Sequence, residues 1–437
     1  FNGTDPNKDS YRIADGDLVS PYQGWYSGLV LREPDNKPVG LMTVKVSKVP
    51  SDSGPTYYLS GKILTFNQPE RSFTGRFLSD GRAVEITEVP ADLAFTIFKW
   101  RRVIGGKLTS EDGSIQRFNL SKAYYNNKRN TNWPLRGNYT YLIPSTTTSS
   151  LAVPAGDGIA HGSINAVGKT TIKGWTNAGY KFTQVRSLRY GNWTRVVGSL
   201  PFYIRSYKTG NGSEWMAGTI NYDGSIVPVE VESRIRYTKP SDNSRYYPSG
   251  YDQDVMIEGS RYRRTAYNGI PAEGFGLFAN NALGLFDGSL PDNSEFAPYI
   301  FSWEADGDMV APLNFTYFTE SKYDDKLGIY TGLHIDQTIG RNSTIRGVVM
   351  QKQGLVSGHG DSSDLGVTVR HNIVPNDTGE VAPSASLSPT SKSFDNDFLV
   401  YQVNIEISPN SIIQNWTVDI PAEADWVTAD VLSGSGS

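Results

Sequence analysis

Apolar and polar residues alternate over short runs along this chain, and clusters of Gly, Asn, Asp, Ser and Pro separate the runs. An alternation with a period of two is typical of a strand that buries one face. Such runs occupy 42–49, 57–64, 72–78, 83–89, 94–103, 283–290, 299–318, 327–335, 343–353 and 365–371. The pattern predicts an all-β protein made of small β-barrels or sandwiches.

Two landmarks recur at nearly the same spacing. A Gly-x-Tyr tripeptide begins at Gly24 and at Gly137, 113 positions apart. A strand that leads into an Asp-Gly-Ser-Ile turn contains Gly106 and then Gly218, 112 positions apart. The agreement predicts a unit of about 112 residues that occurs twice, with a core of its own in each copy. A third Gly-x-Tyr, at Gly328, is out of step, and we interpret it as a similar local device.

We expect the Gly-x-Tyr tripeptides to be structural. A glycine at a strand start allows another segment to lie close to the backbone. The side chains of Tyr26 and Tyr139 would each supply a large apolar body, with a hydroxyl that reaches the rim of the core.

The predicted organisation is a pair of homologous modules, a third β module and the beginning of a further domain. The expected boundaries are an N-terminal tail at 1–16, module 1 at 17–128, module 2 at 129–238, module 3 at 239–372, a linker at 373–386 and a partial immunoglobulin-like domain at 387–437. The Pro, Asp, Thr and Ser residues of the linker, with no sustained apolar period, are the basis of its assignment.

The end of the chain resembles the start of a BACON-type immunoglobulin-like domain. The matching segments are LSPTSKSF at 387–394, WTVDIP at 416–421 and ADWVTA at 424–429, with SGSGS at the end. The resemblance implies that the last strands of that domain are missing and that the chain is a segment of a larger polypeptide. An exposed sheet edge would then invite a strand from another chain, and residues 1–16 are one candidate for that strand.

The preceding residues resemble a poorly characterised β-repeat module of very large secreted proteins from Verrucomicrobia-type and Planctomycetes-type bacteria. The segments that carry the resemblance include GWYSGLV, FTGRFLSDG, GNYTYLIPS, LGLFDGSL and IRGVVMQKQGLVSGHG. The resemblance implies secretion and repeated β domains, and it transfers no catalytic residue.

Composition narrows the classes of function. The net charge of −4 gives no support to a nucleic-acid partner, which usually requires a basic excess. The chain has no cysteine, so disulfides, thiolate metal sites and thiol nucleophiles are excluded. No apolar run is long enough to span a bilayer as a helix.

The histidines offer little chemistry. No two of His161, His334, His359 and His371 have the i, i+3 or i, i+4 spacing of a helical metal site. His359 lies near Asp361 and Asp364, which would form a metal or acid–base cluster if the three converged. A polar Gly/Ser/Asp loop between strands explains this segment equally well, and we prefer that interpretation.

Carboxylate pairs would be needed for a glycoside hydrolase. The candidates are Glu304 with Asp306 and Asp308, and Asp324 with Asp325. Both groups are also typical of turns, so we expect no catalytic residue, no metal and no cofactor.

Exposed aromatic residues are the remaining candidates for binding. Neighbours along a strand face opposite sides of the sheet, so one member of a Tyr pair should point outward. Outward aromatic side chains stack on sugar rings or contact a neighbouring subunit. The candidate binding residues are Tyr57, Tyr124, Trp215, Tyr246 and Tyr247.

Together these observations predict a non-enzymatic extracellular structural or adhesive protein, secreted or at a bacterial cell surface. It would form part of a fibre, sheath or surface layer, with other copies of itself or neighbouring surface proteins as partners. One alternative is a carbohydrate-binding region of a larger polysaccharide-processing protein, with glycans as partners. A second alternative is a cryptic hydrolase in module 3.

Overall fold

The structure is a computed structural model. It describes residues 23–49, 56–66, 68–78, 83–87, 92–98, 103–109, 113–123, 135–148, 152–190, 197–207, 213–224, 230–263, 282–287, 290–292, 294–296, 298–303, 309–310, 316–336, 339–351, 353–375, 385–388, 404–407, 416–417 and 433–434. Within these ranges every regular element is a β-strand, so the predicted class of tandem β modules is confirmed. The described ranges contain no helix that is long and apolar enough to cross a membrane.

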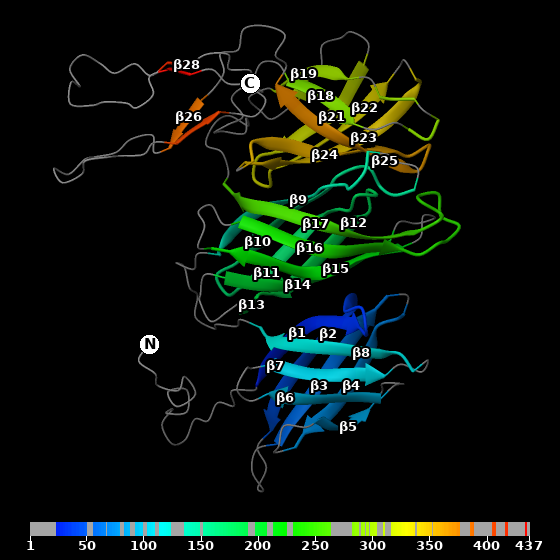
Figure 1. The fold of residues 1–437 in the computed structure, drawn as a ribbon, viewed down its shortest axis with the longest axis vertical. Coiled ribbons are helices and arrows are strands. Elements are labelled where there is room, and N and C mark those ends of the chain that lie inside the picture. Colours follow the sequence, from blue (N-terminus) through cyan, green and yellow to red (C-terminus); the bar gives the residue numbers. More distant parts are fainter. Residues whose placement is uncertain are drawn as a thin grey trace, which may run out of the picture.

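Three large antiparallel sheets follow one another along the longest axis (Figure 1). Module 1 contains β1 (Gly24–Arg32), β2 (Lys37–Val49), β3 (Thr56–Thr65), β4 (Arg71–Phe77), β5 (Ala83–Thr87), β6 (Asp92–Phe98), β7 (Val103–Thr109) and β8 (Ile115–Lys122). Module 2 contains β9 (Gly137–Ile143), β10 (Gly158–Ile164), β11 (Lys169–Trp175), β12 (Lys181–Ser187), β13 (Arg189–Tyr190), β14 (Val197–Tyr207), β15 (Ser213–Asp223), β16 (Glu230–Lys239) and β17 (Tyr251–Tyr262). Module 3 contains β18 (Ala282–Asp287), β19 (Tyr299–Trp303), β20 (Met309–Val310), β21 (Thr316–Asp324), β22 (Ile329–Asp336), β23 (Arg341–Met350), β24 (Leu355–Ser362) and β25 (Val367–Pro375).

All three modules share one topology. In each sheet the strands are hydrogen-bonded in chain order, and the first strand also pairs with the last: β1 with β8, β9 with β17, and β18 with β25. The two edges of each sheet therefore come from the middle of the module. In modules 1 and 3 these edges approach one another, and in module 2 β12 packs beside β14. The result is an up-and-down arrangement of two nearly closed barrels and one half-barrel, and closure hides strand edges where it is nearly complete.

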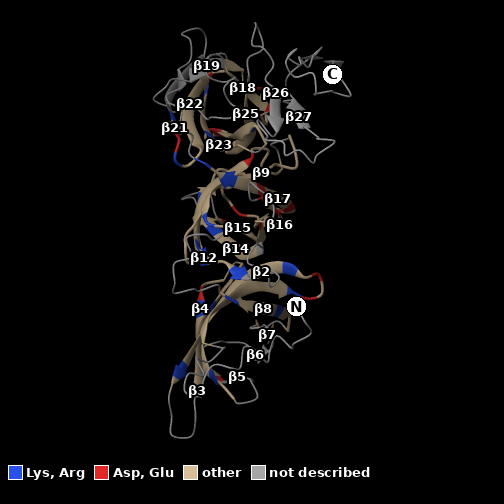
Figure 2. Cartoon of the chain, turned by 90° about the vertical axis from the view of Figure 1, so that its left-hand side faces the viewer, with Lys and Arg blue, Asp and Glu red and all other residues tan. Residues whose placement is uncertain are grey.

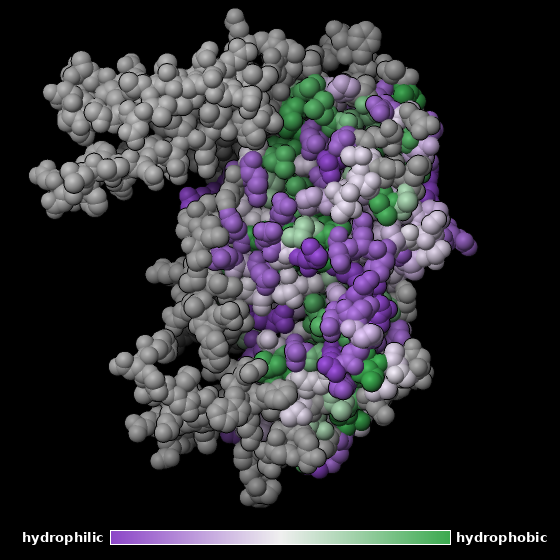
Figure 3. All heavy atoms as spheres, viewed as in Figure 1, coloured by the Kyte–Doolittle hydropathy of each residue, from purple (hydrophilic) through white to green (hydrophobic). Residues whose placement is uncertain are grey.

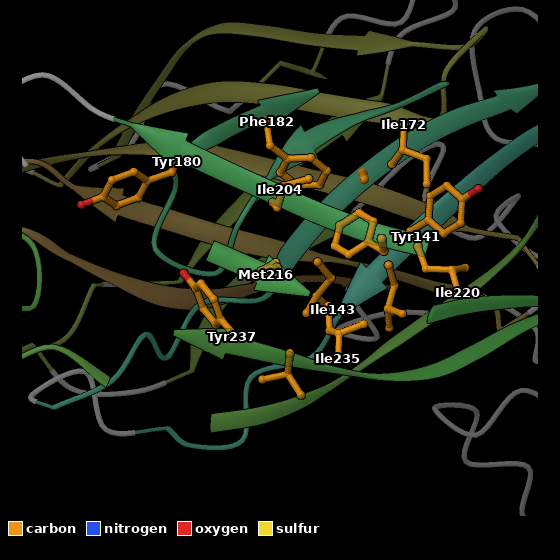
Figure 4. Close-up of a cluster of buried hydrophobic side chains, with 14 of the residues drawn as sticks. Tyr141, Ile143, Ile172, Tyr180, Phe182, Ile204, Met216, Ile220, Ile235 and Tyr237 are labelled. Carbon is orange, nitrogen blue, oxygen red and sulfur yellow. The ribbon is translucent and has the colours of Figure 1, made fainter. Parts of the chain in front are cut away.

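Inward side chains of the strands fill each module, and the core of module 2 continues into module 3 through Leu290, Phe296, Val367 and Val369. Tyr26 is buried in the core of module 1, and Tyr139 is buried in the core of module 2. Figure 4 shows the core of module 2, where Met216 and Ile220 from β15 meet Ile235 from β16. The alternation along the strands thus places one face inside the module, as the period of two predicts.

The Gly-x-Tyr glycines occupy equivalent places in modules 1 and 2. Gly24 begins β1 and Gly137 begins β9, and both have a positive φ, 140° and 155°. A Cβ atom on Gly24 would lie 2.8 Å from Lys122 Cε, and one on Gly137 would lie 2.7 Å from Arg261 Nε. In both modules the close neighbour is a long basic side chain on the strand that closes the sheet. Gly328 instead lies in the turn before β22, with φ of 68°.

The second landmark of the repeat, the Asp-Gly-Ser-Ile turn, does not occupy equivalent places in modules 1 and 2. The Asp-Gly-Ser-Ile turn of module 1 joins β7 to the closing strand β8, whereas that of module 2 joins β15 to β16 and a further strand, β17, closes the sheet. A strict repeat of about 112 residues is therefore wrong. The modules share their topology and their start, and module 2 is longer by one strand after the turn.

The boundary expected at 238/239 also falls inside module 2, because β17 pairs with both β16 and β9. The boundary expected at 372/373 falls inside β25, which extends to Pro375. Closure of each sheet by a distant strand is the physical reason for both shifts.

Two expected elements differ in detail. The run 299–318 forms β19, β20 and part of β21 instead of one strand. The segment around His359, interpreted as a polar loop, is the buried strand β24.

The tail beyond module 3 contributes four short strands to the described residues. They form two ladders, β26 (Ala385–Ser388) with β27 (Asn404–Ile407), and β28 (Trp416–Thr417) with β29 (Ser433–Gly434). The rest of the expected immunoglobulin-like domain, and residues 1–16, lie outside the described ranges. Whether a strand from another chain completes this region stays a prediction.

Candidate functional site

The five candidate aromatic residues do not form an exposed set. Trp215, Tyr246 and Tyr247 are only 2%, 1% and 3% exposed, so the expectation of outward, accessible rings is wrong for them. Tyr57 is half-buried against the core of module 1, and Tyr124 lies outside the described residues. The three buried rings lie where one module meets the next, so their role is not only to fill the core of module 2.

Trp215 lies at the junction between modules 1 and 2. Neighbours along β15 alternate, so Glu214 points into module 2 while Trp215 lies on its outer face. On that face Trp215 joins an apolar cluster whose other members are Leu41, Leu64 and Phe66 of module 1 and Tyr203 and Ala217 of module 2. The Phe66 ring centroid is 5.8 Å from those of both Tyr203 and Trp215. Module 1 therefore covers the Trp215 ring, which lies outside the core of module 2.

Two arginines complete this aromatic contact. The guanidinium of Arg236 lies 5.4 Å from the Phe66 ring centroid, and that of Arg205 lies 5.6 Å from the Trp215 ring centroid. Arg236 also donates to both carboxylate oxygens of Asp252, at 2.7 and 2.9 Å, and to the backbone oxygen of Pro38 in module 1. The hydrogen bonds from Arg236 lower the pKa of Asp252. Arginine planes on aromatic faces add electrostatic attraction to the apolar contact.

A pocket of about 320 Å³ remains open beside these rings. Its walls come from both modules and combine aromatic, amide, hydroxyl and guanidinium groups: Arg32, Val39, Thr65, Phe66, Gln68, Gln116, Trp215, Arg236, Thr238 and Pro240. We call it the junction pocket. Two of its lining residues are cationic and none is acidic. The indole N–H of Trp215 is buried and has no hydrogen-bond acceptor within the described part of the chain.

The junction between modules 2 and 3 is built around Asp157. Its Oδ1 atom accepts hydrogen bonds from the backbone N–H of Ser145, at 2.8 Å, and from Arg370 Nε, at 3.0 Å. Its Oδ2 atom accepts a hydrogen bond from Ser357 Oγ at 2.7 Å. Ser357 and Arg370 belong to module 3, so one carboxylate of module 2 is held by donors from both modules. Burial raises the pKa of Asp157, and Arg370 partly offsets this effect.

His359 belongs to the same network. Its Nδ1–H donates to the backbone oxygen of Asp157 at 2.8 Å, and the backbone N–H of Asp157 donates to Gly358 at 3.1 Å. Strand β24 therefore carries His359 into the junction, which is why a sequence of Gly, Ser and Asp is buried there. Of its expected partners, Asp361 accepts a hydrogen bond from Tyr246 at 2.6 Å, and Asp364 is exposed on the turn after β24. His359 and Asp361 both lie beside Gly179 of module 2, whereas Asp364 does not join them.

Tyr246 and Tyr247 reach module 3 from the loop between β16 and β17. The hydroxyl of Tyr247 accepts a hydrogen bond from the backbone N–H of Thr368 at 3.0 Å, and Thr368 Oγ1 donates to the backbone oxygen of Asn177 at 2.6 Å. A second apolar cluster, with members that include Leu142, Ile159, Val348 and Met350, continues the junction. These contacts explain the burial of both tyrosines.

A buried carboxyl group occupies the interior of module 2. Glu214 Oε2 accepts hydrogen bonds from Tyr237 and Tyr251, at 2.7 and 2.6 Å. Burial raises the pKa of Glu214 to about 7. A shifted pKa of this kind often marks an active site, but burial among core tyrosines also produces it. None of the described pockets is lined by Glu214.

Two histidines are enclosed in module 3. His371 shares hydrogen bonds with Tyr299, at 2.8 Å, and with Tyr330, at 2.9 Å. Burial lowers the pKa of His371 to about 3 and that of His334 to about 4. Both imidazoles are thus neutral at physiological pH and pack as aromatic rings beside Phe286. His161 is half-buried in β10, and burial lowers its pKa as well.

The expected hydrolase residues are placed only in part. Glu304, Asp306 and Asp308 lie outside the described residues. Asp324 Oδ1 accepts backbone hydrogen bonds from Lys326 and Leu327, so it stabilises the turn before β22. No group of three or more His, Asp or Glu side chains suited to a metal occurs in the ranges that the structure describes.

Sequence reasoning missed Asp157, Arg370, Glu214 and Arg236. Glu214 left a signal, because it is a charged residue at an inward position of an alternating strand that also carries Met216. Asp157 and Arg370 are 213 positions apart, and no local pattern connects them.

No protein-family model matches this chain, and no curated protein matches its sequence. One solved structure with some likeness is a protein of unknown function of the DUF3598 family from Nostoc punctiforme, with a TM-score of 0.16 and 10% identity over 55% of this chain and 96% of that one. Another is isotype 1 transferrin binding protein B from serogroup B Neisseria meningitidis, with a TM-score of 0.17 and 12% identity over 80% of this chain and 74% of that one. TM-scores this low carry no argument about fold family or function.

Proposed function

We propose that this chain is a non-enzymatic, extracellular spacer, a stiff building block of a fibre, sheath or surface layer. The observation that carries the proposal is that both junctions bury side chains of one module against the next. Trp215 is covered by module 1, and Asp157 is held by Arg370 of module 3. Domains joined by small polar contacts usually move relative to one another. Here the buried contacts oppose such motion, so modules 1 and 3 are held at a fixed separation.

The arrangement of the modules supports the same role. Seen from the side, the three sheets lie in one column, and charged residues are scattered along it (Figure 2). On the face drawn in Figure 3, hydrophilic residues surround small hydrophobic patches on all three modules. Exposed rings such as Trp25 and Tyr58 on module 1 offer contacts to other copies of the chain or to neighbouring surface proteins. A column with small contact patches suits lateral assembly.

The buried titratable groups support a structural use of the interior. His371 bonds to two tyrosines inside module 3, and Glu214 bonds to two tyrosines inside module 2. Buried side-chain hydrogen bonds of this kind help to specify one packing arrangement. These groups therefore support the spacer without a catalytic role.

Electron microscopy tests the proposal. Purified chain should appear as straight particles of uniform length, and labelled antibodies should locate the chain in ordered assemblies outside the cell. A variant with both Trp215→Ala and Asp157→Ala should give bent particles with variable angles, while Trp25→Ala with Asp287→Ala should not. Cytoplasmic location, or hydrolysis of a polysaccharide by purified chain, would contradict the proposal.

A further inference from the structure

The junction pocket has the composition of a ligand site, which a spacer does not need. Its volume of about 320 Å³ lies at the small end of the range for small-molecule sites. Such sites combine apolar surface with a few polar groups that fix orientation. Here Phe66 and Trp215 provide apolar ring faces, while Gln68 and Thr238 provide amide and hydroxyl groups.

The charge of the walls selects among ligands. Arg32 and Arg236 line the pocket, and no lining residue is acidic. Each guanidinium already forks onto a carboxylate outside the lining, Arg32 onto Asp35 and Arg236 onto Asp252. A guanidinium has five N–H donors, so each fork leaves donors for a further acceptor. The two ion pairs fix the planes of the arginines and thereby pre-organise them for an anion.

One buried donor has no acceptor. The indole N–H of Trp215 belongs to a side chain that is 2% exposed, and the described residues offer it no acceptor. That nitrogen is itself enclosed, so Trp215 contributes its ring to the wall of the pocket and not a hydrogen-bond donor to a ligand.

We propose that the junction pocket binds a short saccharide that carries a carboxylate, such as a uronic acid unit. The ring face of the sugar packs on Phe66, Gln68 and Thr238 form hydrogen bonds to its hydroxyls, and the carboxylate bonds to Arg32 at the rim. Modules 1 and 2 both line the pocket, so occupancy also strengthens their junction.

Isothermal titration calorimetry on the whole chain tests this proposal, with digalacturonate as the acidic probe and galactobiose as the matched neutral probe. Digalacturonate should bind roughly tenfold more tightly than galactobiose, as expected for one charge-assisted hydrogen bond. Arg32→Gln should remove that preference. Arg76→Gln is the matched control, because Arg76 also forks onto a carboxylate in module 1, Glu85, but lies outside the junction pocket.

Gln68→Ala removes an amide group from the wall of the pocket. It should weaken both probes by a similar factor, and thermal melting should show whether the variant keeps its fold. Absence of binding by digalacturonate at millimolar concentration would overturn the proposal. Equal affinity for the two probes, or an equal loss of preference in Arg32→Gln and Arg76→Gln, would overturn it as well.

Discussion

The two junctions of this chain join similar modules by different chemistry. Between modules 1 and 2, aromatic rings and guanidinium planes stack, and a pocket stays open beside Trp215. Between modules 2 and 3, the Asp157 carboxylate is almost enclosed. It accepts hydrogen bonds from one backbone N–H and two side chains. Stacked rings tolerate small displacements, whereas a buried carboxylate needs every donor in place. The first junction is therefore the one suited to a ligand, and the second is the one suited to fixing geometry.

The largest expected effect comes from Asp157→Ala. Removing one partner of a buried ion pair leaves the other unpaired, so the free energy of unfolding should fall by about 3–5 kcal/mol. Asp287→Ala is the matched control, because Asp287 pairs with the same Arg370 but its side chain is 48% exposed, against 4% for Asp157. The control should cost less than about 1 kcal/mol. Urea unfolding followed by circular dichroism measures both, and equal losses would show that the junction is not organised by burial.

Trp215→Ala should have the next largest effect. Truncation of a buried aromatic side chain costs about 3–5 kcal/mol, and the neighbouring pocket allows relaxation toward the lower value, about 3 kcal/mol. Trp25→Ala, at a side chain that is 55% exposed on β1, should change stability by less than about 0.5 kcal/mol. Similar melting curves for the two variants would mean that the rings do not hold the junction.

The raised pKa of Glu214 predicts that the stability of module 2 depends on pH. Its pKa is raised to about 7, so the folded state keeps a proton that the unfolded state releases near its ordinary pKa of about 4.5. Stability from this group is therefore present at low pH and is lost as the pH rises through about 7, by about 2–3 kcal/mol between pH 5 and pH 8. Glu214→Gln should flatten this slope in urea unfolding at several pH values. Glu232→Gln, at an exposed position on β16, should retain it. A slope of opposite sign would contradict the assignment.

The smallest effect is expected at the rim of the first junction. Lys37 Nζ of module 1 lies 3.6 Å from Asp252 Oδ2 of module 2, and both side chains are largely exposed. Lys37→Ala should lower stability by less than about 1 kcal/mol, and the difference should disappear in high salt. A loss that persists at high salt would show that this pair is more than a screened surface contact.

Much of the local structure was predictable from the sequence. The run at 42–49 lies within β2, and the Gly-x-Tyr glycines mark equivalent strand starts in modules 1 and 2. Closure of each sheet was not predictable, because β17 pairs with β9 across a long stretch of chain that carries no local signal for the pairing. Strand β24 was missed because neighbouring strands and module 2 satisfy its polar residues.

The site was predictable only in part. Trp215 was a candidate from its position on a strand, but its burial depends on how module 1 docks, which period and composition do not encode. The pairing of Asp157 with Arg370 likewise depends on two distant segments that meet only when modules 2 and 3 are assembled.

Single-molecule FRET tests the stiffness of the chain most directly. The chain has no cysteine, so Lys107→Cys on β7 and Ser363→Cys after β24 would each carry one dye in modules 1 and 3. A rigid column predicts one narrow distribution of transfer efficiency, which broadens when Trp215→Ala or Asp157→Ala is added. A broad distribution in the unaltered chain, unchanged by these substitutions, would contradict the account.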